Sequence, residues 1–133
     1  MTGKALENIS VLSVDDDPFA LDVISQTLWK LGIHIVETTQ TAEQALEFIK
    51  GDGYSFDVLI CDLHMPETNG VEFLIDLAAV GYKGHFVILS GAIDQTIEMA
   101  RDLANARGLN ILGTLKKPVK AEEVQRLFEK VVS

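Results

Sequence analysis

The sequence lacks several features that would place the protein in a specialised class. Its only cysteine is Cys61, which excludes an internal disulfide and is typical of a reducing compartment. No apolar run approaches the ~18 residues needed to cross a bilayer. The N-terminus also lacks the charged and then apolar layout of a signal peptide. We therefore expect a cytoplasmic protein without a membrane segment.

Basic residues are scarce and dispersed. The chain has 11 Lys and Arg residues against 20 Asp and Glu residues, which gives a formal net charge of −9. Lys116 and Lys117 form the only basic cluster. Contacts with nucleic-acid phosphates require concentrated positive charge, so the composition argues against direct nucleic-acid binding by this chain.

The 133 residues contain no internal repeat, low-complexity segment or Pro/Gly/Ser-rich linker. A chain of this length buries about two thirds of its unfolded surface, so its core suffices without disulfides or metal staples. We therefore expect residues 1–133 to form a single domain.

Apolar runs that predict strands alternate with segments of helical periodicity. The predicted strands are 9–14, 33–38, 56–61, 85–90 and 110–115. The helix at 18–31 is expected to bury Ala20, Ile24, Leu28 and Leu31, and the helix within 69–81 to bury Val71, Leu74, Ile75 and Ala78. This alternation predicts a doubly wound α/β fold with a parallel sheet between two helical layers. The runs 11–14, 58–61 and 86–89 are apolar on both faces and belong in its centre, with 33–38 near an edge.

Polar side chains follow four of the predicted strands. Asp15, Asp16 and Asp17 follow the first strand, Asp62 the third, Ser90 ends the fourth, and Lys116 and Lys117 follow the fifth. The functional groups of such sheets gather beyond the carboxyl ends of their strands. We therefore expect carboxylates, a hydroxyl and an ammonium group to converge at one edge of the sheet.

The aspartate cluster suggests a site for a divalent cation. Like charges about 4 Å apart repel by roughly 4 kcal/mol at an effective dielectric constant near 20. A bound cation converts this repulsion into attraction, and hard oxygen ligands suit Mg²⁺. Asp17 has a simpler alternative role, because an acid at the start of the next helix favours the helix dipole.

Four motifs together resemble the receiver domains of two-component response regulators. They are "VDDDP", "DVLICDLHMPETNG", "VILSG" and "KKP", in the order and spacing of that family, and the resemblance extends from about Ile9 to Val132. It implies a flavodoxin-like (βα)5 fold with a five-stranded parallel sheet of order 2-1-3-4-5. It also implies a signalling switch that accepts a phosphoryl group on an aspartate.

The resemblance assigns a role to each matching residue. Asp62 is expected to be the phosphoacceptor, with the Ser90 hydroxyl and Lys117 contacting the phosphoryl group. Asp15, Asp16, Asp62 and the backbone carbonyl of His64 are expected to hold Mg²⁺ or Mn²⁺. Lys116 competes for the lysine role, but the register with Pro118 favours Lys117. Such a chain is a regulatory domain rather than an enzyme, although it can catalyse its own phosphorylation and dephosphorylation.

The resemblance also implies partners. The phosphoryl group would come from a sensor histidine kinase or a phosphotransfer protein, and an output domain or downstream effector would read the switch. The stretch "ARGLNILGTLKKPV" looks like receivers joined to EAL-type cyclic-di-GMP phosphodiesterase domains. The chain ends directly after its last predicted helix, so we expect no output domain within it. Whether it stands alone or comes from a longer protein is open.

Two other functions remain as alternatives. The spacing of Asp15 and Asp17 resembles the haloacid-dehalogenase phosphatases, but Phe19 stands where that motif has Thr or Val. A phosphorylation-independent interaction module with the same fold is the second alternative. Thr114 occupies a position where receivers often carry an aromatic residue, which puts the usual readout in doubt. The His64 imidazole could lie beside the phosphoryl group or face solvent, and Cys61 is expected in the core.

Overall fold

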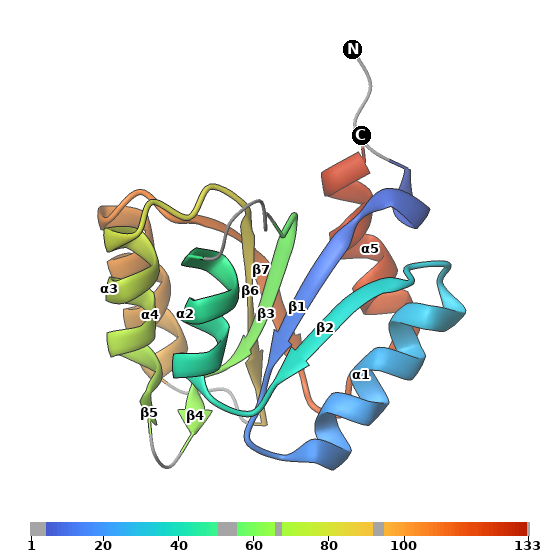
Figure 1. Cartoon of the computed structure of the whole chain (residues 1–133), viewed down its shortest axis with the longest axis horizontal. Helices are drawn as coiled ribbons and strands as arrows, with labels where there is room; N and C mark the ends of the chain where they lie inside the picture. Colours follow the sequence, from blue (N-terminus) through green and yellow to red (C-terminus); the bar gives the residue numbers. More distant parts are fainter. Residues whose placement is uncertain (1–4, 51–55, 66–67, 92–94, 133) are drawn as a thin grey trace.

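A five-stranded parallel sheet forms the centre of the molecule (Figure 1). The computed structural model describes residues 5–50, 56–65, 68–91 and 95–132. The strands are β1 (Ser10–Val14), β2 (Ile35–Thr39), β3 (Val58–Asp62), β6 (His85–Ser90) and β7 (Asn110–Lys116). Their spatial order is β2-β1-β3-β6-β7, with every neighbouring pair parallel. The predicted fold and the strand order 2-1-3-4-5 are therefore confirmed.

The burial of each strand follows from its composition. β3 is buried along its whole length, and Leu12, Val87 and Leu89 of its neighbours β1 and β6 are fully buried. β2 has two apolar residues followed by three polar ones, and its first residue, Ile35, is half exposed. The continuous apolar strands thus lie in the centre and the mixed strand at an edge, as expected for a parallel sheet covered on both faces.

Five helices of the described chain cover the sheet. They are α1 (Pro18–Lys30), α2 (Ala42–Lys50), α3 (Gly70–Ala79), α4 (Gln95–Ala106) and α5 (Ala121–Val132). Figure 1 shows α1 and α5 on one face and α2, α3 and α4 on the other. None of the helices in these ranges combines the length and apolar character that crossing a membrane requires.

The end of α1 displaces the start of β2 from its predicted position. Gly32 has a φ of 88°, a left-handed conformation that glycine adopts without steric strain. The N–H of Ile33 then donates to the carbonyl of Leu28 at 2.9 Å. Ile33 is therefore bonded to the end of the helix rather than to the sheet, and β2 begins at Ile35, two residues later than predicted.

Each face of the sheet has its own hydrophobic core. The α2–α3–α4 side packs Leu12, Phe86 and Ile88 of the sheet against residues that include Phe73 and Leu77. The α1–α5 side contains Val11, Ile60, Val87, Ile24, Leu28 and Phe128. Burying a side chain of this size contributes about 1.5–3 kcal/mol relative to exposing it. The two cores hold the sheet rigidly and fix the positions of the strand ends.

Two predicted helix faces were partly wrong. In α3 the buried residues are Phe73, Leu74 and Leu77, whereas the predicted Val71, Ile75 and Ala78 are only partly buried. In α1, Leu21 is buried in place of Ala20 and Leu31. The apolar residues of α3 extend around most of the helix, so periodicity alone does not select one stripe. Packing against the sheet selects it.

Three short elements were not predicted. A 3-10 helix, η1 (Leu6–Asn8), lies beside the end of α5, and its Leu6 packs against the core on that side. The hairpin β4 (His64–Met65) and β5 (Thr68–Asn69) joins β3 to α3. Elements of two or three residues are too short to produce a recognisable hydrophobic period.

Candidate functional site

The three adjacent aspartates after β1 have three different environments. The Asp15 side chain is fully buried, and its N–H donates to the carbonyl of Thr39 at 3.1 Å, which extends the pairing of β1 with β2. Asp16 and Asp17 are exposed. The carboxylate of Asp17 accepts a hydrogen bond from the N–H of Phe19 at 3.0 Å and caps α1. The predicted capping role of Asp17 is therefore confirmed.

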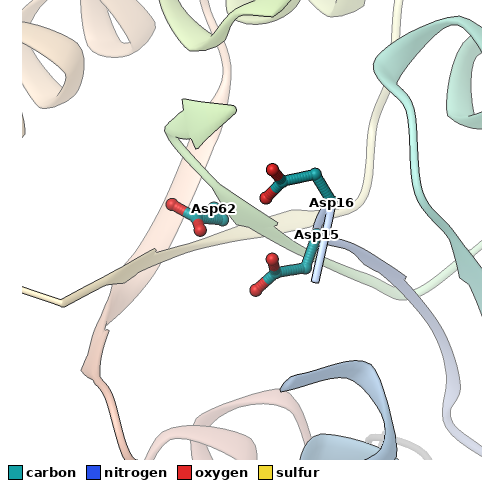
Figure 2. A group of neighbouring side chains, drawn as sticks. All are labelled: Asp15, Asp16 and Asp62. Carbon is teal, nitrogen blue, oxygen red and sulfur yellow. The ribbon is translucent and has the colours of Figure 1, made fainter. Parts of the chain in front are cut away.

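Asp62 brings a third carboxylate to the first two. It is the last residue of β3, is 5% exposed, and lies one strand away from the end of β1. Carboxylate oxygens of Asp15, Asp16 and Asp62 all lie within 4.8 Å of one another. Figure 2 shows the three side chains facing a common space at the carboxyl edge of the sheet. Asp17 is not part of this group.

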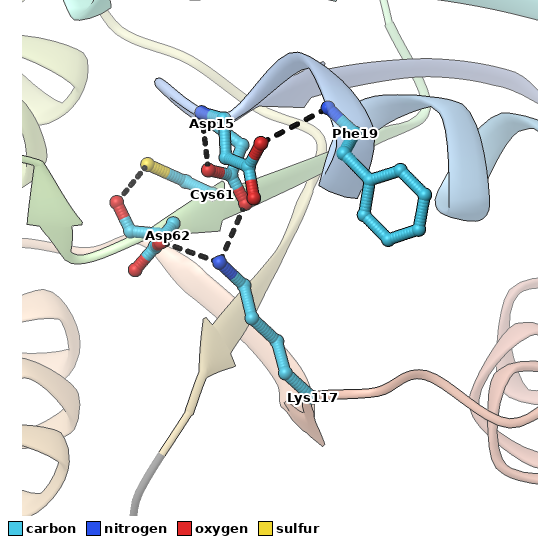
Figure 3. Close-up of polar contacts among 6 residues, drawn as sticks. Asp15, Phe19, Cys61, Asp62 and Lys117 are labelled. Atoms are coloured by element: carbon cyan, nitrogen blue, oxygen red, sulfur yellow. Dashed lines mark hydrogen bonds and ion pairs between the residues drawn. The ribbon is translucent and has the colours of Figure 1, made fainter.

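Lys117 places a positive charge between two of these carboxylates (Figure 3). Its Nζ atom donates a hydrogen bond to Asp62 Oδ2 at 2.8 Å and forms an ion pair with Asp15 Oδ2, also at 2.8 Å. The latter contact lacks hydrogen-bond geometry, so Asp15 Oδ2 accepts no hydrogen bond from the described residues. A buried carboxylate oxygen with this unused acceptor capacity suits a cation ligand.

The backbone fixes Lys117 at the same edge. Its N–H donates to the carbonyl of Ser90 at 2.8 Å, one step beyond the pairing of Ser90 with Lys116. The peptide bond between Lys117 and Pro118 is cis. Ser90 ends β6 and is 2% exposed, so the predicted hydroxyl lies at the edge that also carries the carboxylates.

Burial and charge compete in setting the protonation of the site. Burial raises the pKa of Asp15 above its usual value of 3.8, despite the opposing effects of Lys117 and the Asp17 N–H. Burial lowers the pKa of Lys117, but its contacts with the carboxylates of Asp15 and Asp62 outweigh this effect and raise the pKa overall. The ammonium group therefore remains charged at neutral pH, whereas the ionised form of Asp15 is disfavoured by its surroundings.

Cys61, Thr114 and His64, which the sequence analysis also singled out, lie in or next to the sheet. Cys61 is fully buried, and burial, together with the charges of Asp62 and Asp15, raises its pKa well above the usual value, as expected of a core thiol. Thr114 lies in β7 opposite Ile88, and its buried Oγ1 has no hydrogen-bond partner among the described residues. The backbone of His64 pairs with Asn69 beside the acidic group, while its side chain lies outside the described part of the structure.

Sequence reasoning missed the hydrogen bond that connects Asp15 to the start of α1. The N–H of Asp17, the predicted cap of α1, donates to Asp15 Oδ1 at 3.0 Å. Figure 3 shows the Phe19 ring turned away from the carboxylates. Phe19 as a whole is 72% exposed. The exposed position of Phe19 had one signal in the sequence, because an aromatic residue directly follows the proline that starts an otherwise amphipathic helix.

Comparisons with known proteins agree with this geometry. The family model described as the response regulator receiver domain matches residues 11–129. The chain is 31% identical over 124 residues to cyclic di-GMP phosphodiesterase RocR of Pseudomonas aeruginosa, covering 92% of this chain and 31% of RocR. It is 29% identical over 122 residues to the two-component response regulator ORR24 of Oryza sativa, covering 92% of this chain and 18% of ORR24. The chain thus spans about a third or less of these relatives.

A solved structure shows the same architecture. The chemotaxis protein CheY4 of Vibrio cholerae is 26% identical and superposes with a TM-score of 0.72, covering 93% of this chain and 98% of that one. The fold and the site define a phosphoacceptor switch built on a flavodoxin-like sheet. The chain belongs to the response regulator receiver domain family of two-component signalling. The phosphatase alternative is not favoured, because the Asp17 side chain caps α1.

Proposed function

We propose that Asp62 is the residue that accepts the phosphoryl group. The observation that carries this proposal is the convergence of Asp62 with Asp15, Asp16 and Lys117 at one end of the sheet. Asp62 accepts a hydrogen bond from Lys117 and has a carboxylate oxygen within 4.8 Å of both other carboxylates. In-line attack by a carboxylate oxygen on phosphorus requires no general base, so the remaining residues serve to position the groups and balance charge.

The residues present fit a divalent cation such as Mg²⁺ or Mn²⁺. Three carboxylates offer oxygen ligands within 4.8 Å, and the buried Asp15 Oδ2 has acceptor capacity that no described hydrogen bond uses. We propose that Asp15, Asp16, Asp62 and the backbone carbonyl of His64 hold the ion. When bound, it would neutralise negative charge on the phosphoryl oxygens.

Lys117 and Ser90 complete the proposed reaction site. The Lys117 ammonium lies 2.8 Å from Asp62 Oδ2 and can remain paired with the Asp62 carboxylate while it forms a bond to phosphorus. The Ser90 hydroxyl, at the end of the adjacent strand β6, would donate to a phosphoryl oxygen. The ammonium and the hydroxyl would both stabilise the negative charge that increases on the phosphoryl oxygens during transfer. The same groups would also act when water later hydrolyses the aspartyl phosphate.

The partners follow from the class of protein and from one relative. We propose that a sensor histidine kinase or phosphotransfer protein in the cytoplasm supplies the phosphoryl group and that residues 1–133 form one receiver domain. RocR, a cyclic di-GMP phosphodiesterase, is more than three times as long as the stretch of it that this chain matches. This similarity supports an EAL-type phosphodiesterase as the output that the switch regulates, either in the same polypeptide or as a separate effector.

Intact mass spectrometry tests the assignment of the acceptor. Incubation with Mg²⁺ and acetyl phosphate should add the mass of one phosphoryl group, and the addition should disappear when Mg²⁺ is chelated. Asp62→Asn should remove it, whereas Asp102→Asn, a matched change on the exposed surface of α4, should retain it. No phosphorylation of the wild type would overturn the proposal and favour a phosphorylation-independent interaction module. Persistent phosphorylation of Asp62→Asn would also overturn it, because another residue would then be the acceptor.

A further inference from the structure

An apolar cavity lies directly beside the proposed phosphoacceptor site. It has a volume of about 270 Å³ and lies between α1, the end of β6 and the segment that follows β7. The buried side chains of Ile24 and Leu89 form its inner end. Phe19 and Pro118, both exposed, stand at its opening. The cavity is too small for most drug-sized ligands and suits a group of a few carbon atoms.

The cavity shares structural elements with the site. Lys117 lines the cavity, and the Nζ atom of the same residue donates to Asp62 Oδ2 at 2.8 Å. Asp17 also lines it and connects Asp15 to Phe19 through two hydrogen bonds of 3.0 Å. One residue, Lys117, therefore contacts both the cavity and the proposed acceptor. A molecule that presents its phosphoryl group to Asp62 has the cavity within the span of this one side chain.

The charges around the opening restrict what can enter. The acidic residue Asp17 lines the cavity, and the Lys117 ammonium is already engaged by Asp15 and Asp62. An anionic group would face repulsion there, and a cationic or polar group would lose hydration against Ala20, Val23 and Val119 without gaining a partner. An uncharged apolar group remains as the favoured occupant.

We propose that this cavity is an accessory subsite for the apolar tail of an acyl-phosphate donor. The inference rests on the proposed function of Asp62 and adds a preference among small phosphodonors. In the transfer, an Asp62 carboxylate oxygen forms a bond to phosphorus while the bond from phosphorus to the acyl oxygen breaks. The acyl group leaves as a carboxylate with the electron pair of that bond, so no proton or further reactant is needed.

A pair of donors that differ only in the length of the tail tests this proposal. Acetyl phosphate and butyryl phosphate release carboxylates of closely similar basicity, so their intrinsic reactivity is matched. The second donor carries two additional methylene groups that can enter the cavity. With the full chain and Mg²⁺, we expect initial phosphorylation by butyryl phosphate to be about five- to tenfold faster at equal, sub-saturating concentration, measured by intact mass.

Filling the cavity should remove this preference. Ala20→Leu and Val23→Phe both add side-chain volume to the wall formed by α1, where the wild-type residues are partly exposed. Each should bring the ratio of the butyryl to the acetyl rate constant close to one. Ala79→Leu makes the same change as Ala20→Leu on the exposed end of α3 and should leave the ratio at its wild-type value. The ratio cancels any general effect of a substitution on the reaction.

The outcomes separate this inference from the proposed function. A wild-type ratio of one with normal labelling of Asp62 overturns the subsite and leaves the phosphoacceptor role intact. A high ratio that both filling variants preserve also overturns the subsite. Failure of both donors to label the wild-type protein overturns the proposed function and the subsite together. A high ratio that falls in both filling variants, but not in Ala79→Leu, supports the subsite.

Discussion

Lys117 Nζ donates a hydrogen bond of 2.8 Å to Asp62 Oδ2 across 55 positions of the sequence. The same ammonium lies 2.8 Å from Asp15 Oδ2. One lysine on the chain after β7 thus balances carboxylates at the ends of β1 and β3. These carboxylates are also proposed ligands of a divalent cation. The lysine and the metal would therefore both be attracted to the same two carboxylates.

Removing the lysine charge should therefore tighten metal binding. In Lys117→Met, Asp15 and Asp62 lose their cationic partner, and we expect the Mg²⁺ dissociation constant to fall about three- to tenfold. Phosphorylation of the same variant should be slower, because the phosphoryl oxygens lose a counter-charge. Isothermal titration calorimetry measures the first effect. Lys116→Met, a change at the exposed neighbour, should leave the affinity near that of the wild type, and weaker binding in Lys117→Met would contradict this prediction.

Neutralising Asp15 should stabilise the metal-free fold while impairing metal binding. Burial raises the pKa of Asp15, which means that the folded protein disfavours its ionised form. Asparagine retains an oxygen that can accept the hydrogen bond from the Asp17 N–H. We expect Asp15→Asn to raise the free energy of unfolding at pH 7 by on the order of 1 kcal/mol, or roughly 3–5 °C in melting temperature. A lower melting temperature in the absence of metal would contradict this prediction.

The pH dependence of this gain has a definite sign. At pH values well below 3.8, Asp15 is protonated in both the folded and the unfolded protein, and the substitution should have little effect. As the pH rises from 3.8 through the higher folded-state pKa, the unfolded state ionises first and the wild type loses stability. The difference between Asp15→Asn and wild type should therefore grow over this interval and then remain constant. Urea denaturation at several pH values in chelator measures it.

The adjacent acids Asp16 and Asp17 should respond differently to metal. Mg²⁺ at 100 times its dissociation constant should stabilise the wild type by about 2.7 kcal/mol. Asp16→Asn should lose most of this increment, because Asp16 contributes one of the three clustered carboxylates. Asp17→Asn should retain it, since Asp17 lies outside the group and asparagine caps a helix as well as aspartate. Thermal melts with and without Mg²⁺ compare the two, and equal losses would contradict the assignment.

Much of the fold could be predicted because its central strands are unambiguous. Apolar runs such as that around Ile60 and Val87 have no polar face, which is the property of a strand covered on both sides. The α3 face was harder, because Val71, Phe73, Leu74 and Leu77 offer more than one apolar stripe. The tertiary core then determined which side chains are buried, and no local pattern encodes that choice.

The site divides in a similar way. Convergence of Asp15, Asp62 and Lys117 follows from topology, since parallel strands place their carboxyl ends at one edge. The capping role of Asp17 was also predictable, from its place before the proline that starts α1. The burial of Asp15 beside the exposed Asp16 was not, because it depends on where β1 ends relative to the first turn of α1. The cavity beside Phe19 could not be predicted from the sequence either, because its walls come from three segments that are distant in the chain.

Replacing Thr114 with valine should stabilise the unphosphorylated protein. Its Oγ1 is buried and has no hydrogen-bond partner among the described residues, an arrangement that costs about 1–3 kcal/mol relative to a satisfied hydroxyl. Thr114→Val keeps the shape and the β-branching while removing the hydroxyl. We expect the variant to raise the free energy of unfolding by about 1 kcal/mol in urea denaturation. The β-strand position of Thr114 favours valine as well.

A second threonine provides the matched control for this experiment. Thr27 lies in α1 and its Oγ1 donates to the carbonyl of Val23 at 2.7 Å, so its hydroxyl is satisfied. Thr27→Val should give no comparable gain, because it removes a formed hydrogen bond in addition to the hydroxyl. If both variants stabilise the protein equally, the gain comes from hydrophobicity alone. If Thr114→Val lowers stability, the hydroxyl has a partner in solution, and Thr114 becomes the first residue to examine for a readout that uses no aromatic side chain.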